Sequence, residues 1–372
     1  MRNSTTYKLS GTKTFRRASS KILGRWGSNL QNIEKSMREV YEPDGFNNHL
    51  TAKCSYWLET GDLSIFTEEE LFTLRVFLQT DQSGAEALIV AYDCDPKDYR
   101  QLFIHNVKPH VYVALKLFLD IWKKKAIEHN VLISPDTIDK ISNSKIYELK
   151  NFPEWRDLDK LIKDSDNWSL QERYYYLAKQ TCHSANYDIQ AQTFRMNLLE
   201  KSGGKVNLPM KDADYFLNMY RGLFPEIPER NRRVARQVEE TGIIYNMFGF
   251  PYQITNYNLN ENNMKEYFAW LPQSTVGEIT RKAVTKFQTW VEDTNQVGVD
   301  VLADTHDSFL VQCRLIDVVE VKKMKQHCMN QELVSPIDVT RFNMKSECNC
   351  GFNWNNFKKE KNILGLQEVS WS

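Results

Sequence analysis

Two aspartates stand where strand-like runs are expected to end, and such residues can carry out phosphoryl-transfer chemistry. Asp81 follows the apolar-rich run 74–80, and Asp307 lies in the bend of the segment 301–311. Two β-type runs around a short polar bend predict a hairpin with His306 and Asp307 at its tip. Carboxylates that converge at strand ends are hard oxygen ligands for Mg²⁺. Two such ions, about 3.5–4 Å apart, can clamp the attacking and leaving oxygens of a phosphoryl transfer.

The second informative stretch is 173–187, which predicts a helix with an aromatic and basic stripe. A spacing of four places these residues on one face: Tyr175, Lys179, His183 and Tyr187. Such a face could hold a triphosphate, a sugar and a base in succession, with about 1–3 kcal/mol from each base–aromatic stack. The alternative is a stripe packed into a core, with the lysine stem lying along apolar surface. Taken by itself, the helix favours this alternative.

The composition is globular, but its charge is unevenly distributed. The 372 residues are 41% hydrophobic, and no apolar run approaches the length of a membrane span. A chain of this length can bury a core in two or three subdomains. Basic and acidic residues balance at 48 each, yet residues 1–25 carry seven basic residues and no acid. A transit peptide is one interpretation, but without a clear helical period we favour a basic arm that meets phosphates.

The cysteines indicate a reducing compartment. Their number, seven, is odd and their spacing is irregular, so reduced thiols in a cytosol-like environment fit best. Cys348 and Cys350 could bind a soft metal, but no second pair lies at zinc-ligand spacing, and we interpret them as unpaired thiols.

The order of the expected elements predicts an α+β fold with one antiparallel sheet. We expect a strand ending at Asp81, a helix from Ala85 to Tyr92 and a mainly helical region over 96–240. Within that region, about 120–168 is rich in lysine and aspartate and predicts an inserted, solvated subdomain. The later elements are a hairpin over 241–254 turning at Gly249, a helix over 263–293, a hairpin over 299–313, a helix over 318–331 and a closing strand over 337–344.

At these residues the sequence resembles the family A (polymerase I-like) DNA polymerases, particularly their phage members. The segment 81–86, DQSGAE, resembles the family's first catalytic motif, Asp-x-Ser-x-x-Glu. Lys179, His183 and Tyr187 are similar to its fingers-helix motif, and the segment 306–308, HDS, resembles its third motif, usually His-Asp-Glu. Shorter matches follow in family order: 17–20, 29–33, 109–110, 224–225, 248–249, 273–275 and 353–354. This order makes chance a poor explanation.

The resemblance implies roles for the matching residues. Asp81 and Asp307 would be catalytic and bind two Mg²⁺ ions, Lys179 would contact the triphosphate during catalysis, and Glu86 would exclude a ribose 2′-hydroxyl. The implied nucleotide-binding set is Glu86, His110, Arg173, Lys179, His183 and Tyr187, with His183 near the base or sugar and Tyr187 at the templating position. The implied DNA contacts are Arg17 (with Arg16 as a register alternative), Asn29, Gln31, Gln273 and His306. The partners would be a DNA primer–template and deoxynucleoside triphosphates, with no membrane.

Three positions depart from the family pattern. Tyr175 stands where the family has its fingers arginine, and Arg173 lies off that stripe. Asp188 replaces the glycine that usually follows the fingers tyrosine. Ser308 replaces the glutamate of the third motif.

The resemblance also implies a domain plan for a right-hand polymerase core with an antiparallel palm sheet and mainly helical fingers. Residues 1–95 and 263–372 would form the palm, and 96–262 the fingers. No segment matches the family's thumb or its 3′–5′ exonuclease domain, so we expect weak, salt-sensitive DNA binding by this chain alone. A separate chain carrying both domains is the favoured solution. A shortened, independently active enzyme and a truncated product are the alternatives. Phage DNA replication in the cytoplasm of an infected host is the implied setting.

Two other functions remain open. A single-subunit RNA polymerase would share the palm chemistry, although Glu86 argues against a ribose substrate. A catalytically silent nucleic-acid-binding subunit would be consistent with the departures at Tyr175, Asp188 and Ser308, although both aspartates and Lys179 argue against it.

Overall fold

The chain forms two compact units in the part that the computed structural model describes, which is residues 6–8, 18–20, 35–82, 84–169, 172–254, 260–369 and 371. The first, here called the sheet unit, comprises Met1–Ala85, Gln273–Val334 and Arg341–Ser372. The second, here called the helical unit, comprises Glu86–Pro272 and Ser335–Thr340. Each unit is therefore assembled from segments that lie far apart in the sequence.

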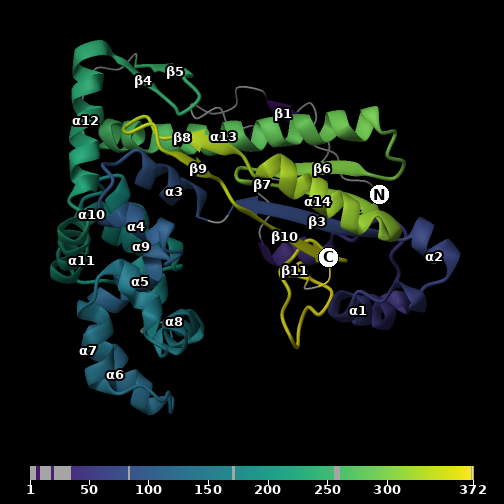
Figure 1. Cartoon of the computed structure of the whole chain (residues 1–372), viewed down its shortest axis with the longest axis horizontal. Helices are drawn as coiled ribbons and strands as arrows, with labels where there is room; N and C mark the ends of the chain where they lie inside the picture. Colours follow the sequence, from purple (N-terminus) through teal and green to yellow (C-terminus); the bar gives the residue numbers. More distant parts are fainter. Residues whose placement is uncertain are drawn as a thin grey trace. The chain divides into compact units, whose positions relative to one another are not determined.

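The sheet unit is built on a five-stranded antiparallel sheet in the order β11-β10-β3-β7-β6 (Figure 1). Its strands are β3 (Arg75–Gln82), β6 (Asp300–Thr305), β7 (Ser308–Arg314), β10 (Ser346–Gly351) and β11 (Gln367–Glu368). Two small sheets pair β1 (Thr6–Lys8) with β2 (Ala18–Ser20) and β8 (Glu332–Val334) with β9 (Arg341–Asn343). The helices are α1 (Thr51–Thr60), α2 (Glu68–Thr73), α14 (Val318–Met329) and the C-terminal part of α13 (Glu261–Asp293), with 3₁₀ turns η2 (Lys35–Val40), η3 (Asn48–Leu50), η4 (Leu63–Ile65) and η8 (Leu315–Asp317).

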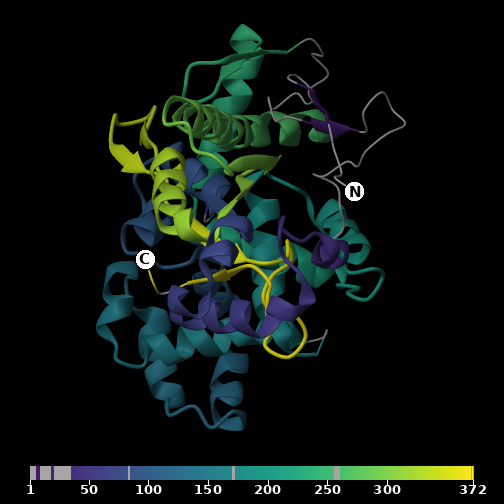
Figure 2. The same ribbon diagram turned by 90° about the vertical axis from the view of Figure 1, so that its right-hand side faces the viewer.

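Successive residues of β3 contribute to opposite faces of this sheet, because alternate residues of a strand point to opposite sides. Val76 and Leu78 join the main core, to which α13 and α14 also contribute. Helix α13 runs beside the β6–β7 hairpin in both views (Figures 1 and 2). Phe77 joins a smaller cluster on the other face. Gln79 and Asp81 share that second face by their spacing, so the acid at the strand end lies on the side opposite the main core.

The helical unit consists of short helices around a central one. Its helices are α3 (Ala85–Tyr92), α4 (Asp98–Ile104), α5 (Pro109–Leu117), α6 (Leu119–Glu128), α7 (Pro135–Asn143), α8 (Trp155–Asp164), α9 (Tyr174–Asn186), α10 (Ala191–Lys201), α11 (Met210–Leu223), α12 (Glu226–Thr241) and the N-terminal part of α13, with 3₁₀ turns η5 (Ile146–Asn151) and η6 (Ser165–Asn167). A hairpin pairs β4 (Ile243–Tyr245) with β5 (Pro251–Gln253). Helices α5, α8, α10 and α11 pack against α9, so α9 is held on several sides within the unit.

The predicted α+β class is confirmed, and most predicted elements lie where we expected them. The strand that carries Asp81, the helix from Ala85 to Tyr92 and both hairpins are present. The first hairpin turns through Gly249 with φ of +78°, a backbone conformation that glycine adopts without strain. Among the described residues, no helix is both long and apolar enough to cross a membrane.

The predicted closing strand over 337–344 is wrong. Strand β9 covers only Arg341–Asn343 and pairs with β8 outside the large sheet. The strand beside β3 is β10, in which Cys348 and Cys350 are buried in the main core. Neither cysteine forms a disulfide. The sequence did not predict this strand because its inward-facing residues are two cysteines, which give a weaker strand signal than β-branched or aromatic residues.

The lysine- and aspartate-rich insertion forms short helices, as predicted. It is not fully solvated, because part of it packs into the helical unit. Trp122, Leu158 and Ile162 are fully buried, and α8 packs against α5 and α9. Its helices are amphipathic, with charges on their outer faces, and α8 packs directly against α9.

Candidate active site

The sheet unit brings Asp81 and Asp307 together. Asp81 is the next-to-last residue of β3, and its register partner on β7 is Ser308, which directly follows Asp307. The backbone N–H of Gln82 donates to the carbonyl oxygen of Asp307 over 3.1 Å. Both aspartates are half-buried. The predicted convergence of two strand-end carboxylates is therefore present in the fold.

The hairpin tip that carries Asp307 has an unusual backbone. His306 has φ of +58° and an exposed side chain. Positive φ is uncommon outside glycine, although histidine adopts it more often than most residues. The tight turn between Thr305 and Ser308 requires it, because these two residues are paired across the hairpin. The turn thus presents the side chain of His306 on the surface beside the aspartates.

Ser308 occupies the position of the family's glutamate, and its hydroxyl has hydrogen-bond partners within the sheet. It is 2% exposed, and its hydroxyl lies 2.5 Å from that of Thr305. The side-chain amide of Gln79 donates to it over 3.4 Å. On the opposite side of β3, the register partner of Asp81 is the exposed Glu347 on β10. Sequence reasoning missed Glu347, because only the pairing register places it beside Asp81.

The helical unit presents the predicted stripe of α9 partly open and partly packed. Lys179 and His183 are exposed, Tyr175 is half-buried, and Tyr187 is buried just beyond the end of the helix. Ser165 caps the start of α9 by accepting a hydrogen bond from the backbone N–H of Tyr175 over 3.0 Å. The packed interpretation therefore holds for the ends of the stripe, and the ligand-binding interpretation stays a prediction for its exposed middle. The middle of the stripe is accessible to a ligand, and its ends are anchored.

Glu86 and Tyr187 form a hydrogen-bonded pair. The hydroxyl of Tyr187 donates to Oε2 of Glu86 over 2.7 Å. Glu86 lies in the first turn of α3, where a carboxylate is favoured by the helix dipole. Burial, together with the neighbouring Glu86 carboxylate, raises the pKa of Tyr187 well above its ordinary value. Tyr187 is therefore a firmly neutral hydrogen-bond donor that fixes one carboxylate oxygen of Glu86.

His110 faces the same helix from α5. Pro109 begins α5 as its first residue, a position that proline favours, and the ring of His110 meets that of Tyr175 edge-on at 6.0 Å. Burial and, to a smaller extent, the positive charges of Lys179, His183 and Lys108 together lower the pKa of His110 to about 4.

We predict that this histidine makes the chain less stable in mild acid. Its pKa in the folded state lies below the ordinary value of 6.5, so the unfolded state takes up the proton first as the pH falls. The stabilising contribution is complete above pH 6.5 and is lost toward about pH 4. The free energy of unfolding should fall by up to about 1.4 kcal/mol per pH unit in this window. His110→Gln should lack that part of the dependence when unfolding by urea is measured from pH 4 to 7, and parallel curves would contradict the prediction.

Two of the departures from the family pattern have local explanations. Arg173, the residue before α9, donates to the carboxylate of Asp166 over 3.0 Å and stacks over Tyr176 at 4.8 Å. These contacts hold its guanidinium away from the position that Tyr175 occupies in the stripe. Asp188 has φ of +55°, in the region that favours glycine and that aspartate tolerates better than most residues. An ion pair with Arg221 at 3.0 Å balances its charge.

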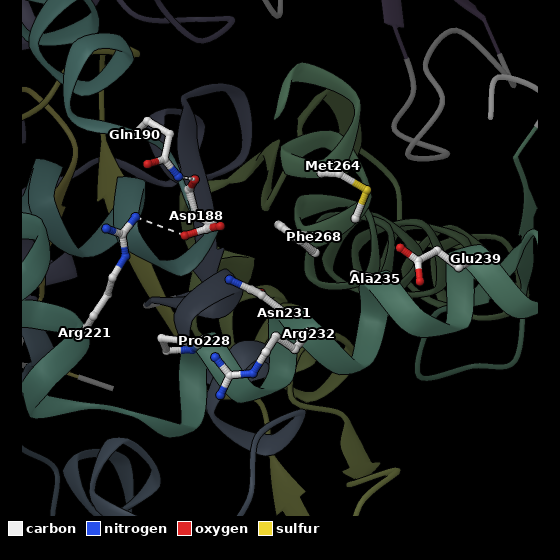
Figure 3. A pocket seen from close by; sticks show the side chains of 10 residues that line it. All are labelled: Asp188, Gln190, Arg221, Pro228, Asn231, Arg232, Ala235, Glu239, Met264 and Phe268. Carbon is white, nitrogen blue, oxygen red and sulfur yellow. Dashed lines mark hydrogen bonds and ion pairs between the residues drawn. The ribbon is translucent and has the colours of Figure 1, made fainter. Parts of the chain in front are cut away.

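A pocket of about 610 Å³ lies beside Asp188 in the helical unit (Figure 3). Arg221, Arg232 and Asn231 line it together with the ring of Phe268. Cationic groups and an aromatic face in one hollow can hold a phosphate and a stacked base. No feature of the sequence pointed to this pocket, because its residues come from three helices and a loop.

The remaining predicted DNA contacts are only partly visible. Arg17, Asn29 and Gln31 lie outside the described residues, as does Ser83 of the first motif. Gln273 is half-buried in α13, directly after Pro272. Among the residues that the structure covers, no group of three or more His, Cys, Asp or Glu side chains is arranged to hold a metal ion. Asp81 and Asp307 stay the predicted metal ligands.

Comparison with known proteins gives two findings. A family model described as DNA polymerase family A matches residues 154–356, more than half of the chain and including Lys179, Tyr187 and Asp307. The fold is similar to a solved structure described as the POL domain of Pol1 from M. smegmatis in complex with DNA primer-template and dNTP, with a TM-score of 0.60 and 15% sequence identity. This similarity covers 94% of the chain and 47% of that structure, so the chain spans about half its length. No curated protein matches.

Proposed function

The chain belongs to DNA polymerase family A, and from this premise we propose that it is a template-directed DNA polymerase that extends a primer 3′-hydroxyl with deoxynucleotides during phage DNA replication. The observation that carries the proposal is the adjacency of Asp81 and Asp307, which come from distant parts of the sequence. The matched region contains Asp307, and Asp81 completes the pair from outside it.

The two aspartates fit divalent metal ions in their chemistry. Both are half-buried carboxylates on neighbouring strand ends, and hard carboxylate oxygens are the ligands that Mg²⁺ prefers. Two Mg²⁺ ions bound there would activate the primer hydroxyl and neutralise the leaving pyrophosphate. The exposed imidazole of His306, at the hairpin tip, would contact the primer–template.

The helical unit would supply the nucleotide contacts. Lys179 is an exposed cation on α9, a helix that is packed on several sides, and it would bind the triphosphate where negative charge accumulates in the transition state. His183 would contact the base or the sugar, and Tyr187 would limit the space at the templating position. Glu86, held by Tyr187, would block a ribose 2′-hydroxyl.

The two units correspond in our proposal to two domains of a right-hand polymerase. We assign the sheet unit to the palm and the helical unit to the fingers. A separate chain that supplies a thumb and an exonuclease would complete the enzyme, since a palm and fingers grip duplex DNA through few phosphate contacts.

Primer extension by the purified chain with Mg²⁺ at low salt tests the function. Extension with deoxynucleotides alone is expected. Equal extension with ribonucleotides would favour an RNA polymerase instead. A chain that binds primer–template but extends nothing, even with a candidate thumb–exonuclease chain added, would be a silent subunit, and the proposal would be wrong.

Glu86→Ala should relax the choice of sugar. Removing the side chain opens the space that a 2′-hydroxyl needs, and the preference for deoxynucleotides should fall by roughly 100-fold. The ratio of kcat/KM for the two nucleotide types measures it. Glu86→Gln is the matched control, because it keeps the size of the side chain and an oxygen that can accept from Tyr187. A relaxed Glu86→Gln enzyme would show that charge, rather than size, excludes the ribose.

A further inference from the structure

Asn186, the last residue of α9, is the centre of a buried hydrogen-bond network. It is 4% exposed, whereas Tyr99 and Tyr220, its partners, are fully buried. The hydroxyl of Tyr220 donates to Oδ1 of Asn186 over 2.6 Å, and Nδ2 of Asn186 donates to the hydroxyl of Tyr99 over 3.1 Å. The side chain of Asn231 donates to the backbone carbonyl of Asn186 over 3.3 Å. The end of α9 is thereby tied to α4, α11 and α12.

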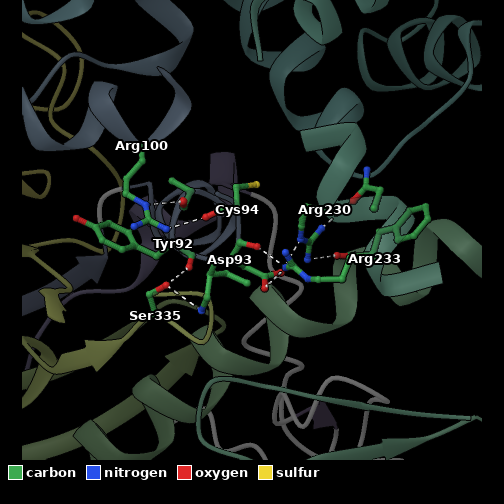
Figure 4. Close-up of polar contacts among 11 residues, drawn as sticks. Tyr92, Asp93, Cys94, Arg100, Arg230, Arg233 and Ser335 are labelled. Atoms are coloured by element: carbon green, nitrogen blue, oxygen red, sulfur yellow. Dashed lines mark hydrogen bonds and ion pairs between the residues drawn. The ribbon is translucent and has the colours of Figure 1, made fainter. Parts of the chain in front are cut away.

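The same network holds the far end of α3. The guanidinium of Arg230 is completely buried and donates to Oδ1 of Asn231 over 3.0 Å and to Oδ2 of Asp93 over 2.6 Å. Asp93 directly follows α3 and also pairs with Arg233 at 2.7 Å. Figure 4 shows the side chains of both arginines reaching Asp93. Helix α3 is therefore fixed at its end through α12, to which Asn186 is also bound.

Two functional side chains lie on the elements that the network joins. Tyr187 directly follows Asn186, and Glu86 lies in the first turn of α3. Their hydrogen bond of 2.7 Å spans the two elements. The relative position of α3 and the end of α9 therefore determines whether this contact forms.

We propose that Asn186, with Tyr99 and Tyr220, is a positioning residue that holds Tyr187 against Glu86 and thereby sets the discrimination between deoxyribose and ribose. This inference rests on the proposed function for its consequence, but its geometric part stands on the contacts alone. Asn186, Tyr99 and Tyr220 are not among the residues to which nucleotide contacts are assigned above. The network acts through the angle at which α9 ends, since a buried and fully satisfied polar network allows few alternative arrangements.

The alternative is that the network only stabilises the helical unit. Apolar side chains of similar size fill a core as well as buried polar groups do, and often better. Two buried tyrosines hydrogen-bonded to one asparagine at a helix end therefore favour a role for a defined geometry there. A double-mutant comparison separates the two cases, because positioning through Tyr187 requires Tyr187 to be present.

The test uses Tyr220→Phe, which removes one hydroxyl and leaves the ring. The matched control is Thr181→Val, which removes a buried hydroxyl that donates to the carbonyl of Leu177 over 2.8 Å within α9. The deoxy-to-ribonucleotide preference should fall about tenfold in Tyr220→Phe, the equivalent of one hydrogen bond. It should not change in Thr181→Val. In a Tyr187→Phe background, Tyr220→Phe should have no further effect.

Crystal structures of the wild-type chain and Tyr220→Phe provide a readout that does not depend on activity. The contact between Tyr187 and Glu86 should be kept in the first and lost in the second. The proposal is overturned if Tyr220→Phe keeps both the contact and the preference, or if its effect multiplies with that of Tyr187→Phe. If the wild-type chain incorporates no nucleotide, the proposed function fails, and the crystal structures still decide the positioning role.

Discussion

Asp81→Asn is expected to abolish nucleotide incorporation while leaving the fold intact. Asparagine keeps the size of the side chain but loses a negative charge and a hard oxygen ligand. Losing several kcal/mol of transition-state stabilisation corresponds to a rate decrease of about 1,000-fold or more. Single-turnover primer extension at saturating Mg²⁺ measures this decrease. The affinity for primer–template at low salt should be unchanged or tighter, because one negative charge is removed near a polyanion.

Glu347→Gln is the matched control for this variant. Glu347 lies opposite Asp81 in the sheet register and is exposed, so the substitution removes the same charge from the neighbouring strand. Its rate should stay close to that of the wild-type chain. Equal losses in both variants would mean that the charge of this face, and not Asp81 itself, matters. Wild-type rates in both would remove Asp81 from the mechanism.

The sequence predicted the elements whose signals are local. The strand of Asp81 and the hairpin of Asp307 each consist of apolar residues around a polar end, and a period of two is readable without knowing the partner strand. The same holds for α9, where a spacing of four predicted the stripe from Tyr175 to Tyr187. The joint role of Asp81 and Asp307 was implied by the family resemblance, because no local pattern says which strands share a sheet.

The features that the sequence did not predict depend on pairing between distant segments. Strand β10 has cysteines as its inward residues, and its place beside β3 depends on a register that no local pattern encodes. Glu347 came beside Asp81 for the same reason. Asn186 falls outside the stripe, and its partners Tyr99 and Tyr220 lie on other helices. Backbone conformation, such as the positive φ of His306, was equally hidden.

Asp93→Ala is expected to cause the largest loss of stability among single substitutions in the helical unit. The carboxylate of Asp93 is 3% exposed and pairs with the fully buried guanidinium of Arg230 at 2.6 Å. Removing one partner leaves a buried charge without its counterion, which typically costs about 3–5 kcal/mol. Urea unfolding followed by circular dichroism measures the free energy of unfolding. Lys97→Ala is the control, because it breaks the exposed pair with Glu229 at 3.0 Å and should change stability far less.

The double variant Asp93→Leu with Arg230→Met separates the cost of an unpaired charge from the value of the pair. Replacing both partners by apolar residues removes the orphaned charge, so much of the stability should return. Recovery should be incomplete, because Arg230 also donates to the carbonyl of Phe268 over 2.9 Å and to Asn231 over 3.0 Å. A double variant as unstable as Asp93→Ala would show that the lost stability resides in these hydrogen bonds and not in the ion pair. The side chain of Asn231, which accepts from Arg230, also donates to the carbonyl oxygen of Asn186. If the network positions α9, a stable double variant should therefore still lose the discrimination between deoxyribose and ribose.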